Sequence, residues 1–488
     1  MVRLAACLLT TLVFLFVPSA QAQTKTYYRP DISAADIDAG CRRDWYGVYF
    51  QTKKIGYFTA NRERTKDGIR ESFLMSMKIA SFGQKIEMKV SQVLTFDAAA
   101  PYALSKGGFS EEVGRNKTDF TFVRTEPGVY DVTQTTGKNV RKRTVKIDYT
   151  LSDSMASEVW IRRNPAVGAE MTSRDFEPKE QKLESQWCKV QSAKQTQANG
   201  VDVKYYEVLA KSTQDNLENL LRFDDTGRML SGKVGSTFDL RLESEAEAKN
   251  TEYGKDLFVF GMAKVDRRLG ERKNVKELVL DVEGPAELQA FIDGPRQKVK
   301  TIDKTTQRVE VGKRFGKTAK ATKEEIEENT GESSTHQIRD PKVKALAEKA
   351  VGDAKTDVEK VQRLVKFVHN YIAPTYEGSQ PNVFDLMDRK RGDCKSYALL
   401  FTNLARASGL PAREVMGLLY VGDGQKAFGG HAWNEVVLNG VWVPIDATFD
   451  ETEIDATHLC FGTQKDASRT MLESLGKLKM KVVEMNGK

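Results

Sequence analysis

Hydrophobic and polar residues alternate in short runs through the first half of the chain. Clear examples are Trp45 to Phe50, Ile86 to Leu94 and Val203 to Leu209. A period of two sends successive side chains to opposite faces of a strand, so this pattern predicts antiparallel strands with one buried face. Turn-forming pairs such as Asn199-Gly200 separate the runs and suit tight hairpins. We therefore expect a large meandering sheet.

The strand pattern continues weakly beyond this region, at Glu277 to Val282 and Gln307 to Val311. We therefore predict a β-rich domain over residues 23–312, possibly built from two subdomains. The composition then changes, because a basic stretch is followed by an acidic stretch and by small polar residues. Such charge runs are typical of solvated segments, and we interpret residues 313–339 as a charged linker.

The hydrophobic period becomes helical after the predicted linker. Asp340-Pro341 has the form of an N-cap followed by proline at the first helical position. Thr356 and Glu359 form a capping-box pattern ahead of a second amphipathic helix. A third helix is predicted to begin at Cys394 and to end at Gly409. With the strands that follow, these helices predict an α+β domain over the rest of the chain.

Two strand-like runs follow the third helix, Ala432 to Leu438 and Val441 to Ile445. Asn439-Gly440 separates them and is a strong signal for a two-residue hairpin turn. This turn fixes the register and places Asp446 diagonal to His431 on the same face of the hairpin, about 7 to 8 Å away. An odd-numbered turn would send one of the two side chains to the opposite face.

Cys394, His431 and Asp446 are the candidate catalytic residues. A thiol nucleophile needs a base, and the base needs a group that orients it. The N-terminus of a helix favours an anion, so the predicted helix start at Cys394 suits a thiolate. Each of the three has a common structural role when it is considered alone. The candidate triad therefore depends on their combination.

Three separated motifs resemble the transglutaminase-like superfamily. They are Gly392-Asp393-Cys394, His431 to Glu435 and Trp442 to Thr448. The resemblance implies a papain-like α+β fold for residues 340–488. It also implies that Cys394 is the nucleophile, that His431 is the general base and acid, and that Asp446 orients the histidine. The family includes crosslinking enzymes, peptidases and amidases, so the reaction outcome stays open.

Two features depart from the family pattern. Lys395 follows the cysteine where threonine is frequent, and Ala447 replaces a common proline. Residues 382–393 also contain no counterpart of the tryptophan that precedes the cysteine in animal crosslinking enzymes. The backbone N–H of Cys394 is then the donor that we expect to stabilise an oxyanion.

The first residues have the pattern of a secretory signal. Arg3 precedes an apolar run from Leu8 to Val17, and Ala20-Gln21-Ala22 is a small-x-small cleavage pattern. We therefore predict a signal peptide over residues 1–22 and a periplasmic or secreted mature protein. No apolar run approaches the length of roughly 20 residues that a transmembrane helix needs.

Four cysteines follow the predicted cleavage site: Cys41, Cys188, Cys394 and Cys460. This number is too small for a disulfide framework. Cys41 with Cys188 is the pair that an exported protein would bridge, since Cys394 has a candidate role. Cys460 is interpreted as a small buried apolar residue, with a redox partnership to Cys394 as the alternative.

The formal net charge of +7 is modest for 488 residues, and no motif for nucleic-acid binding is present. We predict no cofactor and no metal, because no loop resembles a calcium site. The predicted function is that of a secreted cysteine acyl-transfer enzyme acting on peptide or glutamine amide bonds. The predicted partner is a protein or peptide substrate, for which the cell envelope is one location. Hydrolysis is preferred to crosslinking. The alternative is a binding or assembly protein that keeps the fold without catalysis.

Overall fold

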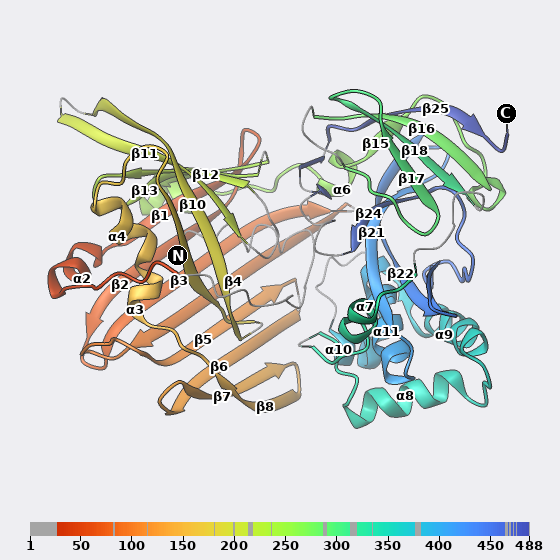
Figure 1. Ribbon diagram of the computed structural model, residues 1–488, viewed down its shortest axis with the longest axis horizontal. Helices are drawn as coiled ribbons and strands as arrows, with labels where there is room; N and C mark the ends of the chain where they lie inside the picture. Colours follow the sequence, from red (N-terminus) through yellow and green to blue (C-terminus); the bar gives the residue numbers. More distant parts are fainter. Residues whose placement is uncertain are drawn as a thin grey trace. The chain divides into compact units, whose positions relative to one another are not determined.

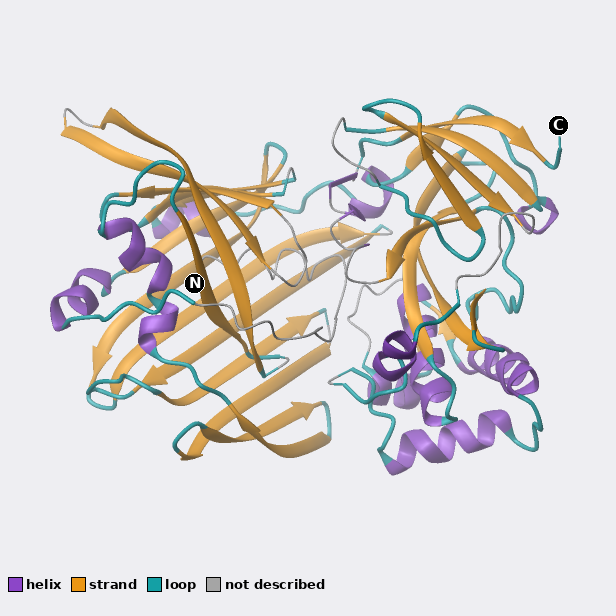
Figure 2. Ribbon diagram, viewed as in Figure 1, coloured by secondary structure: helices purple, strands orange, loops and turns teal. Residues whose placement is uncertain are grey.

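The computed structural model describes residues 27–487, with gaps. The omitted internal residues are 82, 115, 180, 199–200, 213–217, 236, 286–289, 313–319, 334, 376–381, 464–466, 468–469, 472 and 475. The predicted signal peptide and the Asn199-Gly200 turn lie outside the described residues. The chain forms two compact units that divide near residue 255, and each is described by itself (Figures 1 and 2). Among the described helices, none has the length and apolar character needed to cross a lipid bilayer.

The first unit is built on one sheet of fourteen strands, in the order β8-β7-β6-β5-β4-β3-β2-β1-β14-β13-β12-β11-β10-β9. Its strands are β1 (Arg43–Phe50), β2 (Lys53–Thr65), β3 (Gly68–Ser81), β4 (Gln84–Phe96), β5 (Leu104–Val113), β6 (Asn116–Glu126), β7 (Val129–Thr136), β8 (Asn139–Lys146), β9 (Glu170–Glu177), β10 (Lys182–Ala198), β11 (Val201–Ser212), β12 (Glu218–Asp224), β13 (Met229–Val234) and β14 (Phe238–Glu243). Strands that are consecutive in the sequence are neighbours in the sheet except β8 and β9, which form its two edges, and β1 pairs with β14. The predicted meander is confirmed.

The sheet curls around a core on its inner face. Phe122 of β6 contacts Phe176 of β9 edge to face, with ring centroids 5.3 Å apart, although the two strands are not neighbours in the sheet. Alternate residues along β4 and β12 are buried, as the period of two requires. Four short helices complete the unit: α2 (Ala34–Gly40), α3 (Leu151–Ser154), α4 (Ala156–Arg162) and α5 (Glu245–Lys249).

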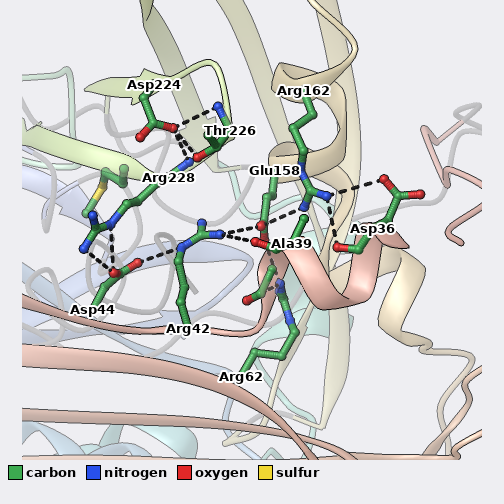
Figure 3. A network of polar contacts seen from close by, with 12 residues as sticks. Asp36, Ala39, Arg42, Asp44, Arg62, Glu158, Arg162, Asp224, Thr226 and Arg228 are labelled. Atoms are coloured by element: carbon green, nitrogen blue, oxygen red, sulfur yellow. Dashed lines mark hydrogen bonds and ion pairs between the residues drawn. The ribbon is translucent and has the colours of Figure 1, made fainter. Parts of the chain in front are cut away.

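A network of ion pairs lies where α4 meets the sheet (Figure 3). Arg62, which is 2% exposed, pairs with Glu71 at 2.8 Å and with Glu158 at 2.7 Å. Arg42 pairs with Glu158 at 2.9 Å and with Asp44 at 3.0 Å. Burial alone would raise the pKa of Glu158, but the charges of Arg62 and Arg42 lower it to about 2. The carboxylate is therefore ionised at neutral pH and depends on its arginine partners.

A small cavity of about 90 Å³ borders this network and is also lined by Cys188. Cys188 is buried, and burial raises the pKa of its thiol to about 12. The predicted bridge to Cys41 is absent, because all four cysteines in the described part of the chain carry free thiols. The sequence could not reveal this, since pairing depends on distances across the sheet.

Replacing Arg62 by leucine is expected to destabilise the first unit. Two carboxylates would lose their buried partner, and breaking a buried pair costs roughly 3 to 5 kcal/mol of unfolding free energy. The urea dependence of amide hydrogen exchange in β2 and β3 measures this change for the first unit alone. Arg64→Leu is the matched control. Arg64 is 43% exposed and pairs with an exposed Asp38, so its loss should cost under about 1 kcal/mol. Equal effects would contradict the interpretation.

The second unit has a nine-stranded sheet in the order β17-β18-β16-β25-β15-β22-β21-β24, with β23 paired to β22. Its strands are β15 (Ala263–Val265), β16 (Glu277–Glu283), β17 (Gln297–Thr301), β18 (Thr306–Gly312), β21 (Ala412–Tyr420), β22 (Ala427–Leu438), β23 (Val441–Ile445), β24 (His458–Thr463) and β25 (Lys479–Met485). Two further short strands, β19 (Ala373–Pro374) and β20 (Arg391–Gly392), pair with each other.

The helices of this unit are α6 (Leu257–Phe260), the 3-10 turn η1 (Arg272–Asn274), α7 (Lys323–Glu328), α8 (Pro341–Val351), α9 (Asp357–Tyr371), α10 (Val383–Arg389) and α11 (Cys394–Ala407). Helices α8, α9 and α11 pack against one another, and α11 also packs on β22 (Figure 1). Leu400 and Leu404 of α11 share a buried cluster with Val436 of β22. Asp340 caps α8 and Thr356 caps α9, as predicted.

Two expectations about the middle of the chain differ from the structure. Strands β16 and β18 were assigned to the β-rich first half, but β16 pairs with β25 near the C-terminus, in the second unit. The segment interpreted as a solvated linker contains α7 and two buried residues, His336 and Gln337. The backbone N–H of Gln337 donates to Asn403 Oδ1 at 2.8 Å. Partners so distant in sequence leave no trace in local composition.

Candidate active site

Cys394 is the first residue of α11, and the residues before it fix that position. Asp393 is the N-cap, and its carboxylate accepts hydrogen bonds from the backbone N–H groups of Lys395 at 3.1 Å and Ser396 at 3.3 Å. Gly392 comes so close to Ser396 that any side chain at this position would overlap it. Gly392 and Asp393 therefore suit the geometry of the helix start, which sets the position of Cys394.

The N-cap changes one expectation about the thiol. Two of the helix amides expected to favour an anion at Cys394 are bound to Asp393. Cys394 instead contributes to raising the pKa of His431, and the two residues line the same cleft. Lys395 turns toward Asp393, with its Nζ 3.6 Å from the carboxylate. His431 is therefore the titratable group to which the thiol is coupled.

The hairpin of β22 and β23 has the predicted register. Leu438 pairs with Val441, and the turn residues Asn439 and Gly440 have φ of 52° and 76°, which are the left-handed values of a type I′ turn. His431 Nε2 lies 2.7 Å from Asp446 Oδ2. The contact between base and acid was therefore predictable from the length of the turn.

The carboxylate of Asp446 is completely buried and is held on both oxygens. Oδ1 accepts a hydrogen bond from the Thr448 backbone N–H at 2.8 Å. Oδ2 lies 2.7 Å from His431 Nε2 and 3.2 Å from His458 Nε2. The loop that follows is closed by two backbone hydrogen bonds between Asp446 and Glu451, at 2.7 and 2.8 Å. The carboxylate therefore has a fixed orientation.

Sequence reasoning did not identify His458, whose Nε2 lies beside Asp446. His458 begins β24 and is fully buried, with its Nδ1 3.3 Å from the backbone oxygen of Asp455. His369 of α9 is a further histidine near the site. Its Nδ1 lies 3.1 Å from the Thr448 backbone oxygen, beside Asp446. The spacing of three residues between Asp455 and His458 was the local sequence signal that could have indicated the contact between these two residues.

The buried charges shift one another strongly. Burial alone would lower the pKa of His431, but the charge and hydrogen bond of Asp446, with a contribution from Cys394, raise it to about 10. Burial would raise the pKa of Asp446, but the two histidines hold it well below its usual value. Burial would also lower the pKa of His458, which its hydrogen bonds to Asp446 and Asp455 raise. The arrangement therefore favours an imidazolium next to an ionised carboxylate.

Aromatic rings enclose the imidazole of His431. Trp433, which is 2% exposed, stacks on it with ring centroids 6.1 Å apart and planes inclined by 19°. Phe449 approaches at 5.5 Å. Trp433 also belongs to a buried cluster with Val415 and Ile454, and its ring shields the ion pair. Glu435 is buried and pairs with Arg413 at 2.8 Å.

A cleft of about 590 Å³ opens at Cys394, which is half-buried. Residues that line it include Arg272, Cys394, Tyr420, Gly429, His431 and Phe449. Its size is in the range of ligand-binding clefts. The thiol and the imidazole are therefore accessible to a substrate from one side.

Two groups of described side chains have ligand atoms close enough to hold a metal ion. They are His431, Asp446 and His458, and Glu451, Asp455 and His458. The histidines and Asp446 already hydrogen-bond with one another, and Arg272 lies 3.0 Å from Asp455. A cation would have to replace these contacts. The absence of a metal requirement stays a prediction.

Comparison with known proteins agrees with the geometry. Residues 344–447 match the model of the transglutaminase-like superfamily. This segment is a transglutaminase-like domain. It contains Cys394, His431 and Asp446. No curated protein matches the chain.

Three solved structures are similar to parts of the chain. A candidate cysteine protease from Cytophaga hutchinsonii is 15% identical, with 44% of this chain and 89% of the other covered and a TM-score of 0.29. A β-barrel-like protein of the DUF1849 domain from Brucella abortus is 11% identical, with 41% and 95% covered and a TM-score of 0.32. The periplasmic domain of TgpA from Pseudomonas aeruginosa is 19% identical, with 36% and 75% covered and a TM-score of 0.28.

The protonation of His431 gives a direct test of the site of the transglutaminase-like domain. We expect its imidazolium to persist at pH 8 and to lose its proton near pH 10. Asp446→Asn removes the main cause that raises this pKa, so the value should fall by more than roughly one unit. Imidazole nitrogen NMR measures both values. The resonances of His336, which pairs with Glu414, are the internal control. An unchanged His431 titration in Asp446→Asn would contradict the assignment.

Proposed function

We propose that the protein is a cysteine acyl-transfer enzyme that acts on peptide or glutamine amide bonds. One observation carries the proposal: His431 Nε2 lies 2.7 Å from Asp446 Oδ2, and His431 and Cys394 line the same open cleft. A thiol, an imidazole and a carboxylate in this order are the components of a cysteine nucleophile and its base. The match to the transglutaminase-like superfamily supports this assignment and a papain-like arrangement of the domain.

The proposed reaction begins with Cys394 as thiolate and His431 as imidazolium. The sulfur attacks the amide carbonyl carbon, and the carbonyl oxygen becomes an oxyanion that the Cys394 backbone N–H stabilises. The C–N bond then breaks. His431 gives its proton to the departing nitrogen, which leaves as an amine or as ammonia. The product on the enzyme is a thioester at Cys394.

A second nucleophile then attacks the thioester and releases Cys394. Water, or the amine of a lysine, gives a proton to His431 and attacks the thioester carbonyl. Loss of the thiolate produces a carboxylic acid in the first case and an amide crosslink in the second. We favour hydrolysis somewhat, because water is in large excess in an open cleft. Asp446 stays ionised throughout and orients the imidazole.

We propose an exported location and a protein or peptide substrate, with the cell envelope as one place where it is met. The signal pattern in residues 1–22 supports export. The proposed reaction uses no nucleic acid and no cofactor.

Loss of the nucleophile tests the proposal. Cys394→Ala should abolish activity, because Cys394 is the only cysteine among the described residues that line the cleft. The intact protein is incubated, in excess EDTA, with a glutamine-containing peptide and a labelled primary amine, and both ammonia release and label incorporation are measured. Cys41→Ala is the matched control and should keep full activity, since Cys41 lies in the first unit.

The outcomes separate the candidate functions. Release of ammonia or peptide fragments without label supports hydrolysis, and incorporation of label without cleavage supports crosslinking. Equal activity of the parent protein and Cys394→Ala would refute catalysis at this site. The domain would then be assigned to binding or assembly.

A further inference from the structure

Asp446 has two imidazole partners, although a cysteine–histidine–aspartate triad needs only one. His458 Nε2 lies 3.2 Å from Oδ2, the oxygen that also binds His431. Both ring nitrogens of His458 are in use, because Nδ1 lies 3.3 Å from the backbone oxygen of Asp455. A fully buried histidine with this arrangement is fixed in position and cannot turn toward solvent.

His458 is held in turn by a second buried acid. Asp455 Oδ1 lies 3.5 Å from His458 Nδ1, and Asp455 Oδ2 lies 3.0 Å from an Arg272 nitrogen. The Asp455 carboxylate also accepts hydrogen bonds from the backbone and the side chain of Thr457. Burial alone would raise the pKa of Asp455, but the hydrogen bond and charge of His458 and the hydrogen bonds of Thr457 lower it to about 2. The Asp455 carboxylate that holds His458 is therefore ionised at neutral pH.

Arg272 connects Asp455 to the cleft. Its guanidinium lies over the Phe449 ring, 4.0 Å from the centroid, and both residues line the cleft. Phe449 contacts the ring of His431. The contacts therefore form a closed circuit, whose members in order are His431, Asp446, His458, Asp455, Arg272 and Phe449. A closed circuit restricts each member more than a linear chain would.

We propose that His458 is a positioning residue, which fixes the Asp446 carboxylate so that its Oδ2 faces His431 Nε2 during the reaction. This inference rests on the proposed function. The physical reason is that a carboxylate rotates about its C–C bond unless both oxygens are held. The backbone N–H of Thr448 holds Oδ1. His431 cannot serve as the fixed partner of Oδ2, because it loses and regains a proton during the proposed reaction. His458 is the partner that holds Oδ2, and it is not among the described residues that line the cleft.

Two substitutions of His458 separate positioning from packing. His458→Gln keeps an N–H donor near the place of Nε2, whereas His458→Leu fills part of the space without a donor. We expect His458→Leu to lower kcat roughly tenfold to a hundredfold, which is typical when a residue that orients a catalytic group is lost. KM should stay within about threefold. His458→Gln should recover most of kcat.

A measurement that does not depend on turnover accompanies the kinetics. The proton on His431 Nε2, bonded to Asp446, gives a downfield NMR resonance in the intact protein. It should move upfield or broaden in His458→Leu and stay in place in His458→Gln. Thermal unfolding of both variants shows whether they remain folded.

The outcomes are distinct for the two proposals. Parent-like kcat and an unmoved resonance in folded His458→Leu would overturn the positioning role. Equal losses of kcat in the folded leucine and glutamine variants would also overturn it, since the donor would then be irrelevant. If Cys394→Ala retains activity, the proposed function fails, while the resonance still shows whether His458 orients Asp446.

Discussion

The buried carboxylate of Asp446 sets the strongest constraint on the second unit. An isolated ion in a protein interior costs several kcal/mol, and only nearby donors and opposite charges offset this cost. The donors come from separate parts of the chain: His431 on β22, His458 on β24 and the backbone of Thr448. Because the strands supply these groups, correct assembly of the sheet and ionisation of Asp446 depend on each other.

The thiol reaches this arrangement through the packing of α11 on β22. Asn434, three residues after His431, donates from its side chain to the backbone oxygen of Ala398 at 3.0 Å and to Thr402 Oγ1 at 2.9 Å. Asn434 and Thr402 are completely buried. These hydrogen bonds fix the position of the N-terminus of α11 along β22. Cys394 is therefore placed beside His431 by a buried hydrogen bond as well as by hydrophobic packing.

The sequence predicted features that depend on local chemistry. A two-residue turn dictates the register of a hairpin, so the contact of His431 with Asp446 followed from Asn439-Gly440. The caps of the helices followed in the same way. Contacts between distant segments were not predictable. His458 reaches Asp446 because β24 pairs with β21, and the segment around His336 is buried because α11 and β21 supply its partners.

The central claim is that Cys394 and His431 form a thiolate–imidazolium pair. The rate of alkylation by iodoacetamide at pH 6 tests it most directly, because only the thiolate reacts and a free thiol with an ordinary pKa of about 8.5 is almost wholly protonated there. The account predicts that Cys394, followed by mass spectrometry of the intact protein, reacts at least about tenfold faster than free cysteine. It also predicts that His431→Ala removes this advantage. A rate no faster than that of free cysteine, or one unaffected by loss of His431, would contradict the account.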